Sequence, residues 1–130
     1  MALVALPSGR LFVLIFNWLE IPMAGPLSTL KVLDFSALLP GPFGTMMLTD
    51  WGADVIRVES PTRPDMVRML PPQQEGISAC HAYLNRSKKS LALDLKKPGG
   101  VDVIKALVKE YDIVVDQFRP GVMDRLGVGY

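Results

Sequence analysis

The sequence predicts an α/β fold in which helices flank a parallel sheet, the first half of a doubly wound arrangement. From residue 30 onward, short β-rich runs alternate with segments whose apolar residues recur at helical spacing, as in βαβ units. Proline and glycine mark the junctions between the two kinds of segment. The 130 residues, 49% hydrophobic and 21% charged, have the composition of a globular chain that can bury one core.

The first strand and helix are the most clearly signalled. Residues 31–35 (KVLDF) predict a strand, which the sequence Pro40-Gly41-Pro42 ends. Pro42 suits the first turn of the following helix, and Gly52 suits the position just beyond its last turn. One face of this predicted helix carries four large apolar residues: Phe43, Met46, Met47 and Trp51.

Three further strands are expected. Residues 54–59 (DVIRVE) form the second, and a Pro-rich loop over about residues 60–76 follows without usable periodicity. Residues 90–95 (SLALDL) form the third, and residues 112–116 (DIVVD) form the fourth. A loop as long as the one after the second strand is usually functional or depends on contacts made elsewhere.

Two more helices complete the predicted pattern. The sequence Pro98-Gly99-Gly100 leads into the first, and Pro120 opens a short final helix that Gly127 closes. The inward-facing residues of the first of these helices are expected at helical spacing: Val101, Ile104, Leu107, Val108 and Tyr111.

The N-terminal residues differ from the rest of the chain. Residues 11–19 form an apolar run too short to span a bilayer, which needs about 20 residues. Glu20, Ile21 and Pro22 lack the small side chains of a secretory cleavage site. We therefore expect residues 1–22 to be an upstream extension outside the fold, with the folded unit over residues 23–130.

Charge and cysteine content exclude several classes of partner. A formal net charge of +1 argues against non-specific nucleic-acid binding and against a polybasic membrane anchor. The single cysteine, Cys80, cannot form an intrachain disulfide and belongs to no metal-ligand spacing. A reducing compartment and a site without metal are expected.

The segment after the first strand is a candidate ligand contact. In residues 36–44 (SALLPGPFG), glycines let backbone approach a ligand, and the helix start offers free N–H groups to an anion. A tight strand-to-helix turn explains the same residues equally well. Neither GxGxxG nor GxxxxGK[ST] occurs here, so nicotinamide and P-loop nucleotides are not indicated.

Polar residues near the second and third strands are weaker candidates. Arg57 and Glu59 share one strand face, which favours a solvated or ion-paired stripe over a binding site. Residues 85–89 (NRSKK), with Lys96 beyond the third strand, could hold phosphate oxygens. A charge run this short is more often a solvated turn.

The segment after the fourth strand, residues 116–121 (DQFRPG), contains Arg119 just before a helix start. Phe118 beside it could cover an adenine or pantetheine group, or could instead pack into the core at a strand-end turn. His81 is expected to pack or hydrogen-bond, and Asp34, if buried, needs a partner. No arrangement of residues supports a nucleophile.

Together these motifs resemble a known family. The segments GPLSTLKVLDFS, PGPFGTMMLTDWGADVIRVE, YLNRSKKSLALDLK and FRPGVMDRLGVGY, in this order, are similar to the opening of the class III CoA transferases. This CaiB/BaiF-like family includes formyl-CoA transferase and α-methylacyl-CoA racemase, and the resemblance runs from about residue 25 to residue 130. It implies the incomplete N-terminal part of a Rossmann-like large domain, and an interlocked homodimer that binds acyl-CoA near the subunit boundary.

The resemblance also implies positions that contact CoA. These are Leu38, Leu39, Leu93, Lys96, Asp116, Gln117, Phe118, Arg119 and Arg125. In one respect the chain departs from the family, because Ser60 and Pro61 stand where many members place an arginine after the second strand. The phosphate contact is then expected to shift to Arg63 or Lys96.

The expected function is that of the CoA-binding portion of an enzyme that moves CoA between carboxylic acids. Acyl-CoA and a carboxylic acid would be its substrates, without a tightly bound cofactor. Alternatives are an α-methylacyl-CoA racemase and a truncated, non-catalytic fragment or interaction module. The family's catalytic residues fall beyond Tyr130 in family order, so whether this chain alone is an enzyme stays open. A cytoplasmic location is expected, with mitochondria or peroxisomes as alternatives in a eukaryote.

Overall fold

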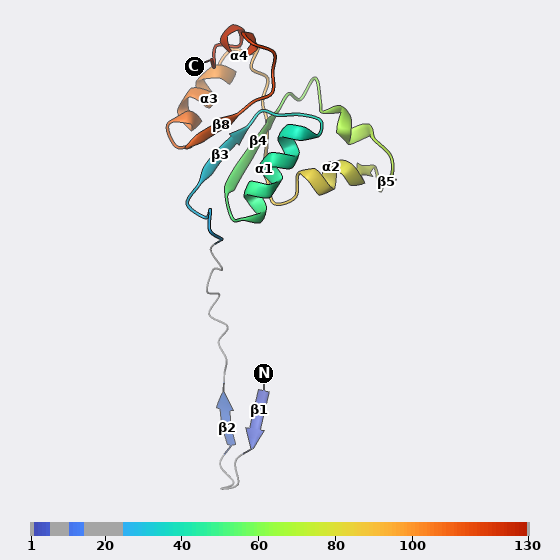
Figure 1. Cartoon of the computed structure of the whole chain (residues 1–130), viewed down its shortest axis with the longest axis vertical. Coiled ribbons are helices and arrows are strands. Elements are labelled where there is room, and N and C mark those ends of the chain that lie inside the picture. The colour runs from blue at the N-terminus through green and yellow to red at the C-terminus, as the bar shows by residue number, and fades with distance from the viewer. Residues whose placement is uncertain (1, 6–10, 15–24, 130) are drawn as a thin grey trace.

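A computed structural model describes residues 2–5, 11–14 and 25–129 of the chain. Its centre is a four-stranded sheet in which every neighbouring pair is parallel (Figure 1). Across the sheet the strands are β7 (Lys89–Ala92), β4 (Asp54–Glu59), β3 (Lys31–Asp34) and β8 (Ile113–Val115). The predicted α/β class with a parallel sheet is confirmed.

The strand order places a topological switch point between β3 and β8. Chain progression runs from β3 outward through β4 to β7, and then returns to the opposite side of β3 to form β8. In open α/β sheets of this kind, ligands bind outside the carboxyl ends of the strands where the order reverses. The exits of β3 and β8 are therefore the first places to look for a site.

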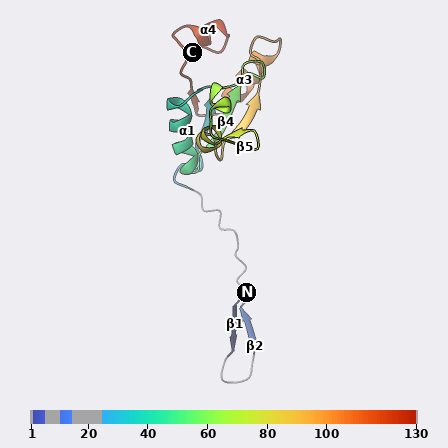
Figure 2. The same ribbon diagram turned by 90° about the vertical axis from the view of Figure 1, so that its right-hand side faces the viewer.

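Helices cover both faces of the sheet (Figure 2). On one face, α1 (Pro40–Asp50) lies over a core cluster that contains Val32 and Val55. On the other, α3 (Gly100–Val108) inserts Ile104 into a cluster with Leu33 and Val58. The final helix, α4 (Val122–Arg125), follows the exit of β8.

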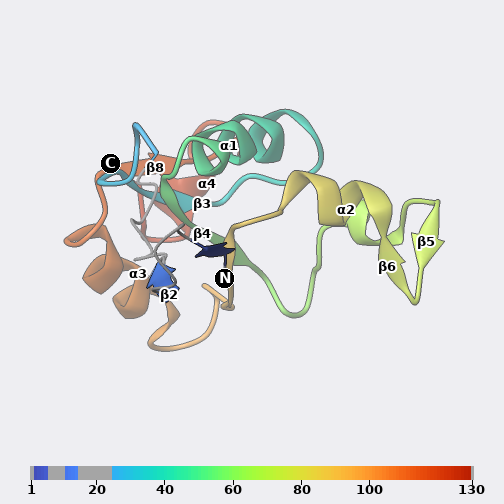
Figure 3. The same ribbon diagram turned by 90° about the horizontal axis from the view of Figure 1, so that it is seen from below.

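Between β4 and β7 the chain forms a set of short elements that project to one side of the sheet (Figure 3). They are the 3₁₀ turn η1 (Met66–Met69), the strand pair β5 (Gln73–Gln74) and β6 (Ile77–Ser78), and helix α2 (Ala79–Leu84). The sequence predicted only a loop for the first part, because elements of two to four residues are too short to show periodicity. Asp65 and Ser78 cap η1 and α2 through their side chains.

The apolar face that the sequence shows on α1 is not its buried face. Phe43, Met47 and Trp51 are 46%, 43% and 54% exposed, and of the four predicted residues only Met46 is buried. The buried face is made instead by Pro42, Thr45, Met46 and Thr49. Compact threonines fit against the sheet because each hydroxyl finds an acceptor, such as the carbonyl of Met46 for Thr49 at 2.7 Å.

The helix ends follow the sequence signals more closely. Helix α1 begins at Pro40, two residues before the predicted first-turn proline, and Gly52 follows its cap with φ of 100°. The glycine is required there because its own φ is positive, and because Gly25 lies 3.0 Å from where a Cβ would stand. Gly127 ends α4 in the same manner, with φ of 76°.

Two other predictions need correction. Strand β7 ends at Ala92 rather than residue 95, because Asp94 accepts a hydrogen bond from the Lys96 N–H and turns the chain. Val108 on α3 is 45% exposed rather than inward-facing, although Ile104 is buried as expected. Strand β8 lies at the sheet edge, where Val114 is 41% exposed.

Near the N-terminus, β1 (Ala2–Ala5) and β2 (Leu11–Leu14) pair antiparallel as a separate two-stranded sheet. Neither strand belongs to the four-stranded sheet. The remainder of residues 1–22 lies outside the described residues, so their assignment as an extension stays a prediction.

Candidate functional site

The exits of β3 and β8 are joined by direct contacts. The side-chain amide of Gln117 donates a hydrogen bond to the carbonyl of Ala37, and the Phe35 N–H donates to the Val115 carbonyl at 2.8 Å. Gly41, in the first turn of α1, makes this approach possible. A Cβ there would stand 2.2 Å from the Ser36 Cβ and 2.7 Å from the Gln117 Oε1.

Leu38 is held in an unusual backbone conformation in the β3 exit. Its φ is 61°, in the left-handed region that a leucine rarely adopts. Its N–H donates to Oδ2 of Asp65 at 3.0 Å, which fixes the turn. As a result Leu38 and Leu39 present side chains that are 46% and 51% exposed, and backbone strain of this kind is typical of functional sites.

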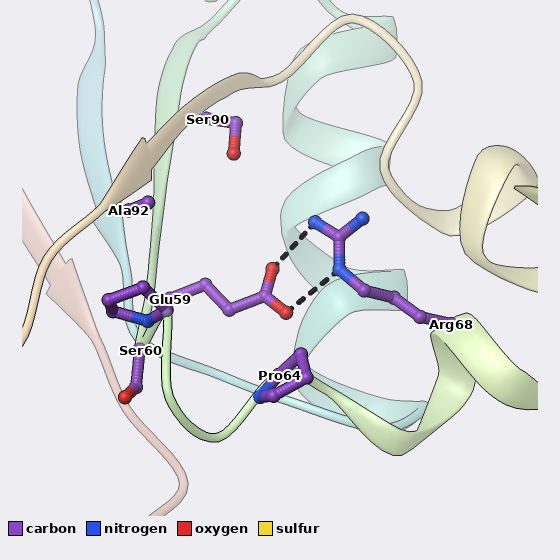
Figure 4. A pocket seen from close by; sticks show the side chains of 7 residues that line it. Glu59, Ser60, Pro64, Arg68, Ser90 and Ala92 are labelled. Carbon is purple, nitrogen blue, oxygen red and sulfur yellow. Dashed lines mark hydrogen bonds and ion pairs between the residues drawn. The ribbon is translucent and has the colours of Figure 1, made fainter.

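Ion pairs stabilise the exit of β4 beside this turn. Arg57 pairs with Asp65, and Glu59 accepts two hydrogen bonds from Arg68, at 2.9 and 2.8 Å (Figure 4). The hydrogen bonds from Arg68 lower the pKa of Glu59 to about 2. The predicted polar stripe is thus ion-paired and mostly shielded from solvent.

A hollow of about 190 Å³ lies next to the Glu59–Arg68 pair (Figure 4). Ser60 and Pro61 lie in its wall. The small side chains of Ser90 and Ala92 on β7 form another part of the wall. Arg63, one of two residues expected to compensate, is exposed in the loop beyond Pro61.

The basic segment 85–89 does not gather its charges at one place. Lys88 is directed inward to Asp34, Arg86 pairs with Asp50, and Lys89 pairs with Asp54. Each cation is thereby committed to a different carboxylate. The sequence left two interpretations of residues 85–89 open, a phosphate-binding cluster and a solvated turn. These three separate ion pairs do not support the phosphate-binding cluster.

The predicted contact residues fall into two groups along the carboxyl edge. Leu38 and Leu39 lie near Asp116 and Gln117, because the Ala37–Gln117 contact joins the exits of β3 and β8. Leu93 and Lys96 belong to the β7 side, where the Leu93 N–H donates to the Glu59 carbonyl at 2.9 Å. Leu93 is half-buried against the core cluster around Ile104.

The cations expected to contact CoA are accessible. Lys96, Arg119 and Arg125 are exposed, and none of them forms an ion pair within the described residues. Phe118, beside Arg119, is 40% exposed rather than buried in the core. Such side chains can reach an anionic ligand without first breaking an internal salt bridge.

Sequence reasoning missed Asp65, Arg68 and Lys88 as organisers of this edge. A signal for the first existed, because Arg57 sits among Val55, Ile56 and Val58 in an apolar strand and a buried arginine requires a carboxylate. Which carboxylate supplies it could not be known, since Asp65 lies in the segment predicted only as a loop. No group of three or more potential metal ligands occurs within the part of the chain that the structure describes.

Comparison with known proteins places these features in a family context. The family model described as CoA-transferase family III matches residues 27–130. An acetyl-CoA:oxalate CoA-transferase of Acetobacter aceti is 42% identical over 106 residues, covering 82% of this chain and 27% of that protein. Human succinyl-CoA:glutarate CoA-transferase is also 42% identical, covering 81% of this chain and 24% of its own.

Solved structures give the same result. A CAIB/BAIF family protein from Brucella suis superposes with a TM-score of 0.75 at 37% sequence identity, covering 82% of this chain and 29% of that one. The chain therefore spans about a quarter of the length of the curated relatives that it matches. Among the described residues no helix is long and apolar enough to cross a membrane.

Proposed function

The chain belongs to the CoA-transferase family III, and we propose that it supplies the CoA-binding part of an enzyme that moves CoA between carboxylic acids. The observation that carries the proposal is the joined exits of β3 and β8 at the switch point. Beside them lie exposed cations that form no ion pair among the described residues: Lys96, Arg119 and Arg125. The two relatives described above carry the names of transferases that use oxalate and glutarate. Those names favour CoA transfer over racemisation.

In this proposal the chain binds and orients the nucleotide end of CoA. Arg119 lies in the loop between β8 and α4, and Arg125 is the last residue of α4. Both donate charge-assisted hydrogen bonds to phosphate oxygens. Phe118 covers an apolar or aromatic part of the ligand, and Leu38 and Leu39 form the opposite wall. Holding the remote end of CoA fixes the position of its thioester, which is how such binding assists a reaction.

The reaction itself needs a carboxylate that attacks the thioester carbon and expels the CoA thiolate, leaving a mixed anhydride. The released thiolate then attacks the enzyme-derived carbonyl of the anhydride, which forms an enzyme–CoA thioester and frees the first carboxylic acid. The second carboxylate attacks that thioester to give a new mixed anhydride and CoA thiolate. The thiolate then attacks the substrate-derived carbonyl, which yields the new acyl-CoA and restores the enzyme carboxylate, so that one hard exchange becomes several easier steps. We place the attacking carboxylate in a family segment C-terminal to residue 130, and we expect the functional unit to be a homodimer. Binding, rather than turnover, is therefore the property to test on these 130 residues.

A binding measurement tests the proposal directly. CoA is titrated into the chain and into the double variant Arg119→Gln/Arg125→Gln by isothermal calorimetry at low salt. Losing two charge-assisted phosphate contacts is expected to weaken CoA binding by about 10-fold or more. A tenfold change in affinity requires the loss of only about 1.4 kcal/mol of binding free energy. Lys105→Gln, an exposed cation on α3, serves as the control and should bind CoA as the parent does. Equal affinity in all three proteins would reject the proposed site.

A second candidate is a module that acts only in association with another polypeptide segment. Four large apolar residues at intervals of four are all exposed along one side of α1: Leu39, Phe43, Met47 and Trp51. A contiguous apolar stripe of this kind on a soluble domain usually marks a contact surface. Co-purification with a full-length family subunit, abolished by Phe43→Gln/Met47→Gln, would favour this function.

A further inference from the structure

A buried arginine in the middle of β4 has unused hydrogen-bonding capacity. The Arg57 side chain is 3% exposed, and its Nη2 atom pairs with Asp65. Its Nε and Nη1 atoms are also buried, and neither has a hydrogen-bond partner among the described residues, although Nε lies 4.0 Å from Oε2 of Glu59. Leaving buried donors of a charged group unsatisfied costs about 1–3 kcal/mol or more, so native proteins seldom tolerate it without a reason.

A third unpartnered atom belongs to His81, on the neighbouring helix. The Nε2 atom of His81 on α2 is buried and likewise lacks a partner within the described part of the chain. Burial and the nearby arginines lower the pKa of His81 below its usual 6.5, so the ring is neutral at pH 7 and carries one N–H. Arg57 and His81 both line a hollow of about 360 Å³. Its wall also contains Arg68, Asn85, Lys88, Lys89 and Ser90.

The positive charges in the wall of this hollow are largely neutralised by carboxylates that pair with them. Arg57 and Arg68 face Asp65 and Glu59, and the lysines of the wall have carboxylate partners of their own. What remains is a set of unpartnered N–H donors with little excess positive charge. Such a site suits a singly charged anion better than phosphate, which carries up to two charges at neutral pH.

We propose that this hollow is a binding site for a small carboxylate monoanion, which accepts hydrogen bonds from Nε or Nη1 of Arg57 and from Nε2 of His81. The hydroxyl of Ser90 and the amide of Asn85 complete the ring of polar groups around it. The hollow includes residues at the middle of β4 and the start of β7, whereas the proposed CoA contacts follow the carboxyl ends of the strands. The site can thus be occupied or empty independently of CoA.

Side-chain NMR on the full 130-residue chain tests the proposal without any turnover. Sodium acetate is titrated into ¹⁵N-labelled protein at constant ionic strength, with sodium chloride making up the balance. Saturable shifts of the Arg57 Nε–H and the His81 ring resonances are expected, while the Nε–H of Arg119 stays unchanged. Inorganic phosphate, in a parallel titration, is expected to bind at least 5-fold more weakly.

Variants separate a specific site from general salt effects. His81→Phe keeps an aromatic ring but removes the Nε2 donor, and should weaken acetate binding at Arg57 by about 5-fold or more. Lys105→Gln, away from the hollow, should leave it unchanged. Arg57 and His81 shifts that fail to saturate with acetate, or an unchanged affinity in His81→Phe, would overturn the proposal and leave water as the partner of these donors. Tighter binding of phosphate than acetate would also overturn it.

Discussion

Lys88 and Asp34 form a salt bridge in the interior of the domain, with the Nζ and Oδ2 atoms 3.2 Å apart and side chains that are 1% and 0% exposed. Lys88 also donates to the carbonyl of Pro42 at 2.9 Å and to the hydroxyl of Thr45 at 2.7 Å. Asp34 accepts further hydrogen bonds from Ser36 and Thr45. The pair thereby ties the end of β3 and the start of α1 to the segment that precedes β7.

Removing the buried lysine should destabilise the domain strongly. Lys88→Met leaves Asp34 buried without its counter-charge, and breaking a buried pair in this way costs about 3–5 kcal/mol. Urea unfolding at pH 7 measures the loss. Lys89→Gln is the matched control, because its pair with Asp54 is 64% exposed on the lysine side and should contribute less than about 1 kcal/mol. Similar losses in the two variants would contradict this role for Lys88.

Adding one methyl group at Gly41 should disturb the proposed CoA site. Gly41→Ala places a Cβ 2.2 Å from that of Ser36 and 2.7 Å from Oε1 of Gln117, so the exits of β3 and β8 must separate. We expect weaker CoA binding in calorimetry and a loss of stability of about 1–3 kcal/mol.

Gly44 on the same helix provides the control for this experiment. Apart from its chain neighbours and the backbone of its own helix, no atom lies within 4 Å of a Cβ built at Gly44, so Gly44→Ala meets no obstacle. Because alanine is a better helix former than glycine, stability should rise by up to about 1 kcal/mol, with CoA affinity unchanged. If Gly41→Ala behaved as Gly44→Ala does, the close approach at Gln117 would have no functional meaning.

The Glu59–Arg68 pair should make stability depend on pH in the acid range. The pKa of Glu59 is about 2 in the folded protein against an ordinary 4.5, so the unfolded chain binds more protons between these values. Its contribution is fully present above about pH 4.5 and is lost as the pH falls toward 2. Because Arg68 is 42% exposed, the contribution should be about 1–2 kcal/mol.

Denaturant titrations of the parent and of Glu59→Gln at several pH values check this expectation. The parent should be more stable than the variant at pH 6, and the difference should shrink steadily between pH 4.5 and pH 2. A difference that stayed constant across this range would mean that Glu59 is not held ionised by Arg68.

The exposed stripe on α1 should limit the solubility of the chain. Replacing Phe43 and Met47, which are 46% and 43% exposed, by glutamine removes apolar surface without opening a cavity. Sedimentation velocity should show less self-association of the double variant, with stability changed by less than about 1 kcal/mol. Val103→Gln on α3, which is 42% exposed but outside the stripe, should leave association as it is. Unchanged association of the double variant would show that the stripe is not responsible.

Several features of this protein could be predicted from local sequence. Strand β4 has the predicted bounds, and Gly52 and Gly127 follow their helices as expected. These predictions succeed because strand alternation and left-handed glycine caps depend on a few neighbouring residues. The family was also recognisable, since its motifs are continuous in sequence and the profile match confirms it.

Only the tertiary structure decided which groups meet. Phe43 and Met46 have the same apolar character, but the packing of α1 on the sheet buries one and exposes the other. The partners of Asp34 and Arg57 lie 54 and 8 residues away, at distances along the chain that no local pattern encodes. The sequence determined the order and type of the main strands and helices through short-range preferences. Packing determined the ion pairs, the strained turn at Leu38 and the unsatisfied donors of Arg57, because burial is a property of the whole assembled domain.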